Sequence, residues 1–104
     1  GYEAGAALVA RGLPDGVFCS NDLMALGVLA ALRDRGIRVP EDVAVVGYDD
    51  VSGAAFFSPS LTTVRQPFDE VGRLCMEVLL EAIGGAEGRS HSISPTLQVR
   101  RSST

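Results

Sequence analysis

Two pairs of polar residues stand where predicted strands of this sequence end. Asp49-Asp50 follows the apolar run at 43–46, and Asn21-Asp22 follows a short apolar run at 16–20. An ionised carboxylate accepts several hydrogen bonds and an amide both accepts and donates, so these residues suit the neighbouring hydroxyl groups of a sugar or another polyol. The same residue types also cap helices and form Asx-turns, and their spacing alone leaves that purely structural role open.

The sequence offers little for catalysis. His91 is the only histidine, and its Ser-rich surroundings predict an exposed spacer residue. There is no GxSxG elbow, no phosphate-binding glycine loop ahead of a helix and no CxxC pair. Asp49-Asp50 lacks the third acid or histidine that a metal site needs. We therefore predict no catalytic residue, no metal and no cofactor, and the chain is not expected to be an enzyme.

The elements that position the polar pairs alternate between helices and strands. Apolar periodicity and Gly or Pro breaks predict helices at 1–12, 22–35 and 68–83, a short helical stretch at 52–57, and strands at 16–20, 43–46, 61–65 and 93–100. Strands alternating with helices at this spacing favour an α/β fold, a parallel sheet with flanking helices.

In such a sheet, ligands bind beyond the carboxyl ends of the strands, where loops converge. Asn21 and Asp49 follow neighbouring strands and should lie on the same edge. We expect Asp49 to point into the crevice and Asp50 to cap the short helix at 52–57. Either Ser20 or Asn21 can cap the helix at 22–35.

The helix at 22–35 is apolar around its whole circumference, which predicts that it is buried on all sides. A sheet covers one face only, so a second subunit is a natural cover, extended by Phe56 and Phe57. Upstream sequence of the same chain is the alternative. The helix at 68–83 is different: it has one apolar face, while Asp69, Arg73, Glu77 and Glu81 face water.

The bulk composition limits the partners. At 104 residues the chain is one domain or part of one, and its start in helical register predicts further sequence upstream. Thirteen acidic residues against nine arginines, without any lysine, give a net charge of −4 and no basic stripe for nucleic acid. No apolar run is long enough to cross a membrane. Cys19 and Cys75 are expected to be buried free thiols.

Three segments taken together, "SNDLMALGVLAALRDRGIRVPEDVAVVGYDD", "SPSLTTVRQPFDEVG" and "LQVRRSST", resemble the carboxyl-terminal part of the lactose-repressor/galactose-repressor (LacI/GalR) family of bacterial transcription regulators. The resemblance implies a partial periplasmic-binding-protein-like (type I) lobe of a two-lobed effector domain. Residues 1–65 would be part of the carboxyl-terminal lobe, 66–92 a crossover and a helix of the other lobe, and 93–104 the return strand and tail. The amino-terminal DNA-binding domain would be absent.

The resemblance also implies roles for particular residues. Asn21, Asp49 and Gln66 would hydrogen-bond a small effector, expected to be a sugar, and Phe68 would offer an apolar face to its ring. Three further residues would lie at the interface of a homodimer: Leu26, Ala30 and Phe57. The protein would be cytoplasmic and would reach DNA only through its amino-terminal domain.

Two further expectations follow from the resemblance. The helix at 68–83 lacks its usual partner lobe, so we predict that its apolar face packs on its own sheet or on a swapped neighbour. The alternative function is a periplasmic sugar-binding protein of a transport system, which has the same lobes but needs an export signal and should be monomeric.

Overall fold

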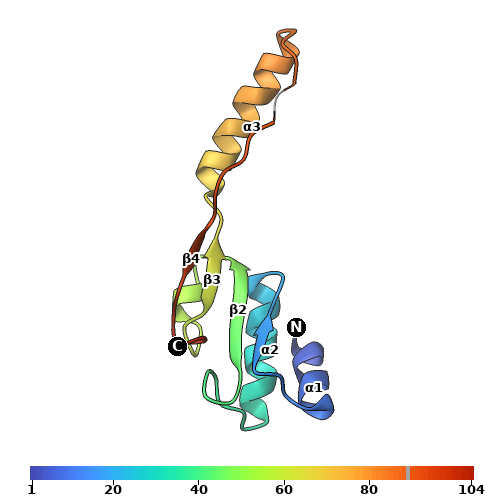
Figure 1. The fold of residues 1–104 in the computed structure, drawn as a ribbon, viewed down its shortest axis with the longest axis vertical. Helices are drawn as coiled ribbons and strands as arrows, with labels where there is room; N and C mark the ends of the chain where they lie inside the picture. Colours follow the sequence, from blue (N-terminus) through green and yellow to red (C-terminus); the bar gives the residue numbers. More distant parts are fainter. Residues whose placement is uncertain (89) are drawn as a thin grey trace. The chain divides into compact units, whose positions relative to one another are not determined.

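The computed structural model describes residues 1–88 and 90–104, and Arg89, within the predicted 66–92 segment, lies outside the described residues (Figure 1). The predicted elements are present, in the order α1 (Tyr2–Arg11), β1 (Gly16–Phe18), α2 (Asp22–Asp34), β2 (Ala44–Asp49), the 3-10 turn η1 (Ala54–Phe56), β3 (Thr62–Arg65), α3 (Phe68–Ile83) and β4 (Thr96–Gln98). The chain divides into two compact units, Gly1–Arg65 with Thr96–Thr104, and Gln66–Pro95.

The sheet belongs to the first unit and has the strand order β1-β2-β3-β4. β1, β2 and β3 run parallel, as predicted, whereas β4 runs antiparallel to β3. Connectivity explains this difference. The chain leaves β3 at Arg65 and re-enters at Thr96, its register partner, so the returning strand must run in the opposite direction. The fold is therefore α/β with a mixed sheet.

The core of the first unit lies between α2 and the sheet. Ala25, Val28, Leu29 and Leu32 of α2 are buried with Val43, Val45, Ala54 and Leu61. α1 covers a second side of α2, and Figure 1 shows the two helices next to each other. Leu23, Met24 and Leu26 remain exposed. The predicted all-round burial of α2 is thus only partly achieved within this chain.

Two glycines allow α1 and α2 to pack closely. A Cβ atom on Gly27 would lie 2.6 Å from the backbone nitrogen of Tyr2, and one on Gly5 would lie 2.8 Å from the Cβ atom of Ala31. These separations are shorter than van der Waals contact, so larger residues would force the helices apart.

The carboxyl terminus is part of the core. Ser102 is fully buried, and its hydroxyl donates to the carbonyl oxygen of Val45 while it accepts the N–H of Thr62 at 2.8 Å. The N–H of Val45 in turn donates to the carbonyl oxygen of Ser102 at 2.9 Å. The segment read from sequence as a polar tail therefore joins β2 to β3.

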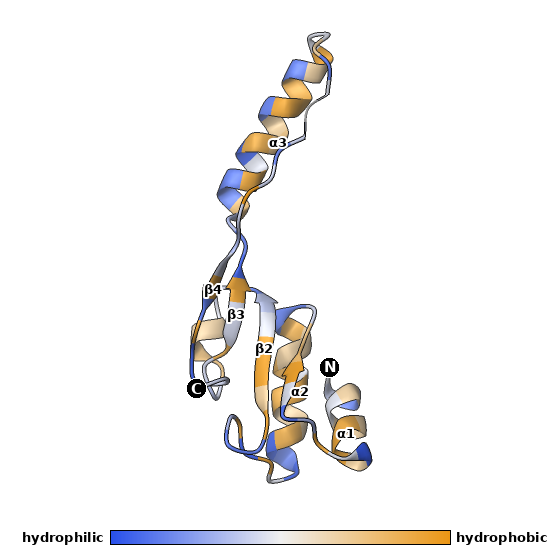
Figure 2. Cartoon of the chain, viewed as in Figure 1, coloured by the Kyte–Doolittle hydropathy of each residue, from blue (hydrophilic) through white to orange (hydrophobic). Residues whose placement is uncertain are grey.

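The second unit consists of α3 and the segment that follows it. Hydrophobic and hydrophilic residues alternate along α3 (Figure 2). None of its residues is buried. Its apolar face borders an open groove of about 500 Å³, formed with His91 and Ile93 of the return segment. Cover of this face by the chain's own sheet or by a swapped neighbour stays a prediction. Cys19 is buried, whereas Cys75 on α3 is exposed, contrary to prediction.

Gly27→Ala is expected to destabilise the chain by about 1 to 3 kcal/mol, because the added methyl group would strike the backbone of α1. Gly72→Ala in α3 is the matched control, since nothing lies within 4 Å of its added Cβ. Because glycine weakens a helix, the control should be neutral or stabilising by roughly 0.5 to 1 kcal/mol. Urea unfolding followed by circular dichroism measures both, and equal effects of the two substitutions would contradict the close packing of α1 on α2.

Candidate ligand-binding site

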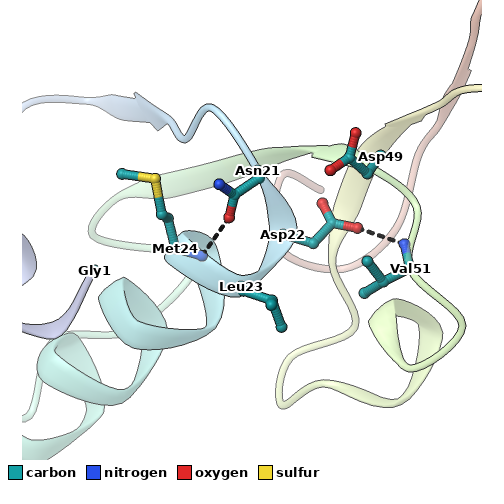
Figure 3. Close-up of a pocket in the computed structure, with 7 residues that line it drawn as sticks. All are labelled: Gly1, Asn21, Asp22, Leu23, Met24, Asp49 and Val51. Carbon is teal, nitrogen blue, oxygen red and sulfur yellow. Dashed lines mark hydrogen bonds between the residues drawn. The ribbon is translucent and has the colours of Figure 1, made fainter.

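A pocket of about 490 Å³ lies at the carboxyl ends of β1 and β2 (Figure 3). It is open to solvent and is lined by Gly1, Asn21, Asp22, Leu23, Met24, Asp49 and Val51. Asn21 stands between β1 and α2, and Asp49 is the last residue of β2. The structure thus brings these two predicted site residues to one pocket, because parallel strands end at the same edge of the sheet.

Asn21 also caps α2. Its backbone is extended, and its Oδ1 atom accepts the N–H of Met24 at 2.8 Å. This bond satisfies one of the free N–H groups at the start of the helix and confirms the predicted cap. The oxygen is therefore committed to the helix, and the amide nitrogen is the part of the side chain that can donate to a ligand.

Asp49 and Asp50 occupy an unusual backbone conformation. Their φ angles are 120° and 57°, in a region that residues other than glycine rarely adopt. Two such residues in succession cost of the order of 1 to 3 kcal/mol each, and such strain persists only where surrounding contacts hold it. Asp49 is half-buried and lines the pocket, whereas Asp50 does not line it.

Asp50 does not cap the short helix, contrary to prediction. Its carboxylate accepts Arg65 Nε at 2.7 Å and Arg100 Nη1 at 2.8 Å, and only 7% of the side chain is exposed. Burial favours the neutral acid, but the hydrogen bonds and charges of Arg100 and Arg65 outweigh it, so the pKa of Asp50 lies below its usual value. Asp50 therefore links the end of β2 to β3 and to the segment after β4.

Asp22 is the site residue whose role the sequence did not reveal. It is fully buried, and its Oδ2 atom accepts the N–H of Val51 at 2.8 Å while Oδ1 accepts the hydroxyl of Thr63 at 2.6 Å. A Cβ atom on Gly47 would lie 2.3 Å from Oδ1, so glycine is required where β2 passes this carboxylate. A first-turn Asp is usually a solvated helix charge, and only the fold shows that this one lies under β2.

Gln66 and Phe68 lie in the second unit and do not line this pocket. Gln66 is half-buried and its carbonyl oxygen accepts the N–H of Phe68 at 2.9 Å. Phe68 is the first residue of α3, and 56% of it is exposed.

The three predicted interface residues all lie in the first unit. Leu26 on α2 is 41% exposed, and Ala30 one turn later is half-buried. Phe57 is also half-buried, because it packs against the hydrophobic core, while its neighbour Phe56 is 86% exposed.

Among residues 1–88 and 90–104, no group of three or more acidic, histidine or cysteine side chains could hold a metal ion. Nor is any helix in that part of the chain long and apolar enough to cross a membrane.

Known proteins share both the sequence and the fold. The periplasmic binding protein-like domain family matches residues 1–104. The chain is 44% identical to the HTH-type transcriptional repressor PurR of Salmonella arizonae, over 98% of the chain and 31% of that protein. It is 41% identical to PurR of Haemophilus influenzae, over 98% of the chain and 32% of that protein. The chain thus spans about a third of the length of these curated relatives.

Solved structures extend the comparison. The lac repressor dimer bound to operator and the anti-inducer ONPF matches with a TM-score of 0.90 and 31% identity, over 98% of this chain and 32% of that one. The complex of the transcriptional regulator CelR with cellobiose matches with a TM-score of 0.86 and 41% identity, over 97% of this chain and 33% of that one.

The fold and the pocket at the carboxyl edge of its sheet define a domain of the periplasmic-binding-protein type. Within that class, the chain belongs to the LacI/GalR family and is part of its effector-binding domain. The relatives named above are transcriptional repressors and regulators, not enzymes, and they do not favour the transport alternative.

The lowered pKa of Asp50 makes stability depend on pH. The contribution of this carboxylate is fully present above its usual pKa of about 4 and is lost as the pH falls below that value toward the lowered pKa of the folded state. Asp50→Asn should cost about 1 to 3 kcal/mol at neutral pH and should reduce the loss of stability on acidification. Urea unfolding at neutral and acidic pH measures this, with exposed Asp15→Asn as the control. An unchanged acid dependence would contradict the assignment.

Proposed function

We propose that this chain is the effector-sensing part of a transcriptional regulator, and that a small polar molecule, most simply a sugar, controls DNA binding by the full-length protein. The proposal is supported chiefly by the pocket that joins Asn21 and Asp49 at the carboxyl edge of the sheet. Membership of a family with an effector-binding domain supports an effector as the ligand of that pocket. A related regulator has been solved with cellobiose, which supports a sugar as the ligand class.

In this proposal four residues contact the effector. The Asn21 amide nitrogen donates to a ligand oxygen, and the Asp49 carboxylate accepts from ligand hydroxyls through charge-assisted hydrogen bonds. Gln66 supplies a further hydrogen bond and Phe68 an apolar face for the ring. Residues 1–65 then belong to the carboxyl-terminal lobe, 66–92 form the crossover and a helix of the other lobe, and 93–104 form the return strand and tail.

Ligand binding would act on a dimer. A ligand changes DNA binding only if it has different affinities for the conformations that bind and do not bind the operator. We propose that Leu26, Ala30 and Phe57 lie at the dimer interface, which would cover the exposed apolar residues of α2. This chain has no basic stripe, so DNA contacts come from an amino-terminal domain of the full-length protein, which acts in the cytoplasm.

The ligand class can be tested by thermal unfolding of the full-length protein with cellobiose, lactose, galactose and ribose. A ligand that binds the folded state raises Tm in a concentration-dependent way. At least one of these sugars is expected to do so, and no shift with any of them at millimolar concentration would argue against a sugar effector.

Asp49→Asn is expected to weaken binding of a stabilising sugar about tenfold, because the variant keeps the shape of the side chain but loses its charge. Asparagine also tolerates positive φ, so backbone strain should not confuse the result. Isothermal titration calorimetry of the full-length protein measures the change. Asp15→Asn, at the opposite ends of the strands, is the matched control, and equal affinities of wild type and Asp49→Asn would remove Asp49 from the site.

Leu26→Glu is expected to weaken dimerisation at least about tenfold, because it would bury a charge in an apolar interface. Sedimentation velocity of the full-length protein at several concentrations measures the dissociation constant. Ala10→Glu adds the same charge at an exposed position of α1 and serves as the control. If the Leu26 variant dimerises like the wild type, α2 is not the interface.

A further inference from the structure

The turn that carries Asp49 is held by a buried network beneath the pocket. The N–H of Asp50 donates to Thr63 Oγ1 at 3.3 Å, and the Thr63 hydroxyl donates to Asp22 Oδ1 at 2.6 Å. The N–H of Val51 donates to Asp22 Oδ2 at 2.8 Å. Both backbone N–H groups that follow Asp49 are therefore bound, directly or through one hydroxyl, by a single carboxylate.

The N–H groups of Asp50 and Val51 have few other hydrogen-bond partners within reach of this geometry. Asp22 and Thr63 are both fully buried, so water cannot replace either partner without opening the structure. Asp22 comes from the start of α2 and Thr63 from β3, while the turn continues β2. Gly47 leaves room for the carboxylate. Three elements distant in sequence thus meet at one side chain.

The network also accounts for the strained turn. Asp49 and Asp50 have φ angles of 120° and 57°, which residues with side chains adopt only when their surroundings hold them there. The bonds to Thr63 and Asp22 fix the N–H groups of Asp50 and Val51, which follow the strained residue Asp49 in the chain. With the Asp50 and Val51 N–H groups anchored, the end of β2 cannot relax to an ordinary extended conformation, which would redirect the Asp49 side chain.

We propose that Asp22 and Thr63 are positioning residues, which aim Asp49 into the pocket by holding the turn at 49–51. Neither acts as the principal ligand contact in this assignment. The inference rests on the proposed function for its consequence in binding, but the positioning itself is a property of the protein without ligand.

Thr63→Val tests the positioning directly. Valine matches the shape of threonine but removes the hydroxyl, which breaks the bond to Asp50 and leaves Asp22 Oδ1 without its partner. Hydrogen–deuterium exchange of the full-length protein, followed by mass spectrometry, compares peptides covering the turn with peptides covering Val45 and Val46. Exchange at the turn should become at least about tenfold faster relative to the strand. The free energy of local opening falls in this variant, because the hydrogen bonds that opening must break are already missing.

Thr63→Ser is the matched control, because it keeps the hydroxyl and should keep exchange at the turn within about twofold of the wild type. Should Thr63→Val prove too unstable to purify, Asp22→Asn replaces it; this variant keeps an acceptor for the Val51 N–H but loses the charge, and should also speed exchange at the turn selectively. If the turn of the tested variant exchanges at the wild-type rate, the network does not hold the turn and the proposal fails. If turn and strand are accelerated equally, the network serves global stability only, and the proposal fails as well.

A second readout follows if a sugar of the panel binds. Thr63→Val should weaken binding of that sugar about tenfold, although Asn21 and Asp49 are unchanged in this variant. Thr63→Ser should bind the sugar with the wild-type affinity. Normal affinity in the valine variant would overturn the positioning role. If no sugar binds, the proposed ligand class fails, while the exchange experiment still decides the positioning of the turn.

Discussion

One buried carboxylate organises the carboxyl edge of this sheet. Asp22, the first residue of α2, has no exposed surface, yet it binds Thr63 of β3 and Val51 of the turn after β2. A buried charge is tolerated only when hydrogen bonds replace its water, and here two short bonds do so. The pocket, the glycine at position 47 and the strained backbone at Asp49 and Asp50 all depend on this side chain being where it is.

Adjacent acids at the end of β2 have different tasks because their side chains leave the backbone in different directions. Asp49 lines the pocket, whereas Asp50 binds Arg65 at the end of β3 and Arg100 in the segment after β4. These arginines flank the two points where the chain leaves the first unit and returns to it. Asp50 thus connects the turn that carries the pocket-lining Asp49 to both arginines, and a shift of the turn at 49–51 would disturb its bonds to them.

The exposed apolar surface of the chain fits a part of a larger assembly. Leu26 and Phe56 are exposed in the first unit, and the apolar face of α3 is not buried in the second. The chain spans about a third of the length of its curated relatives, so most of each relative's sequence has no counterpart in this chain. In the proposed regulator, a second subunit would cover α2, and the population of the DNA-binding form would depend on which conformation the effector favours.

Local sequence patterns determined much of this protein. Apolar periodicity and Gly or Pro breaks predicted every helix and strand, including α3 at its observed bounds, because these signals act within a few residues. The order of the strands also placed Asn21 and Asp49 at one edge, since parallel strands end together. Three segments taken together, the one ending in "GYDD", the one around "LTTVRQP" and the closing "LQVRRSST", then indicated the family, which the comparisons confirmed.

Contacts between distant segments were decided by tertiary structure alone. The sequence could not show that Asp22 turns under β2 instead of facing solvent, or that Asp50 binds arginines 15 and 50 residues away instead of capping the next helix. Nor could it show that Ser102 is buried between strands, or that β4 runs antiparallel. The physical reason is common to all four: periodicity reports which residues share a face of one element, whereas a hydrogen-bond partner depends on which elements become neighbours in space.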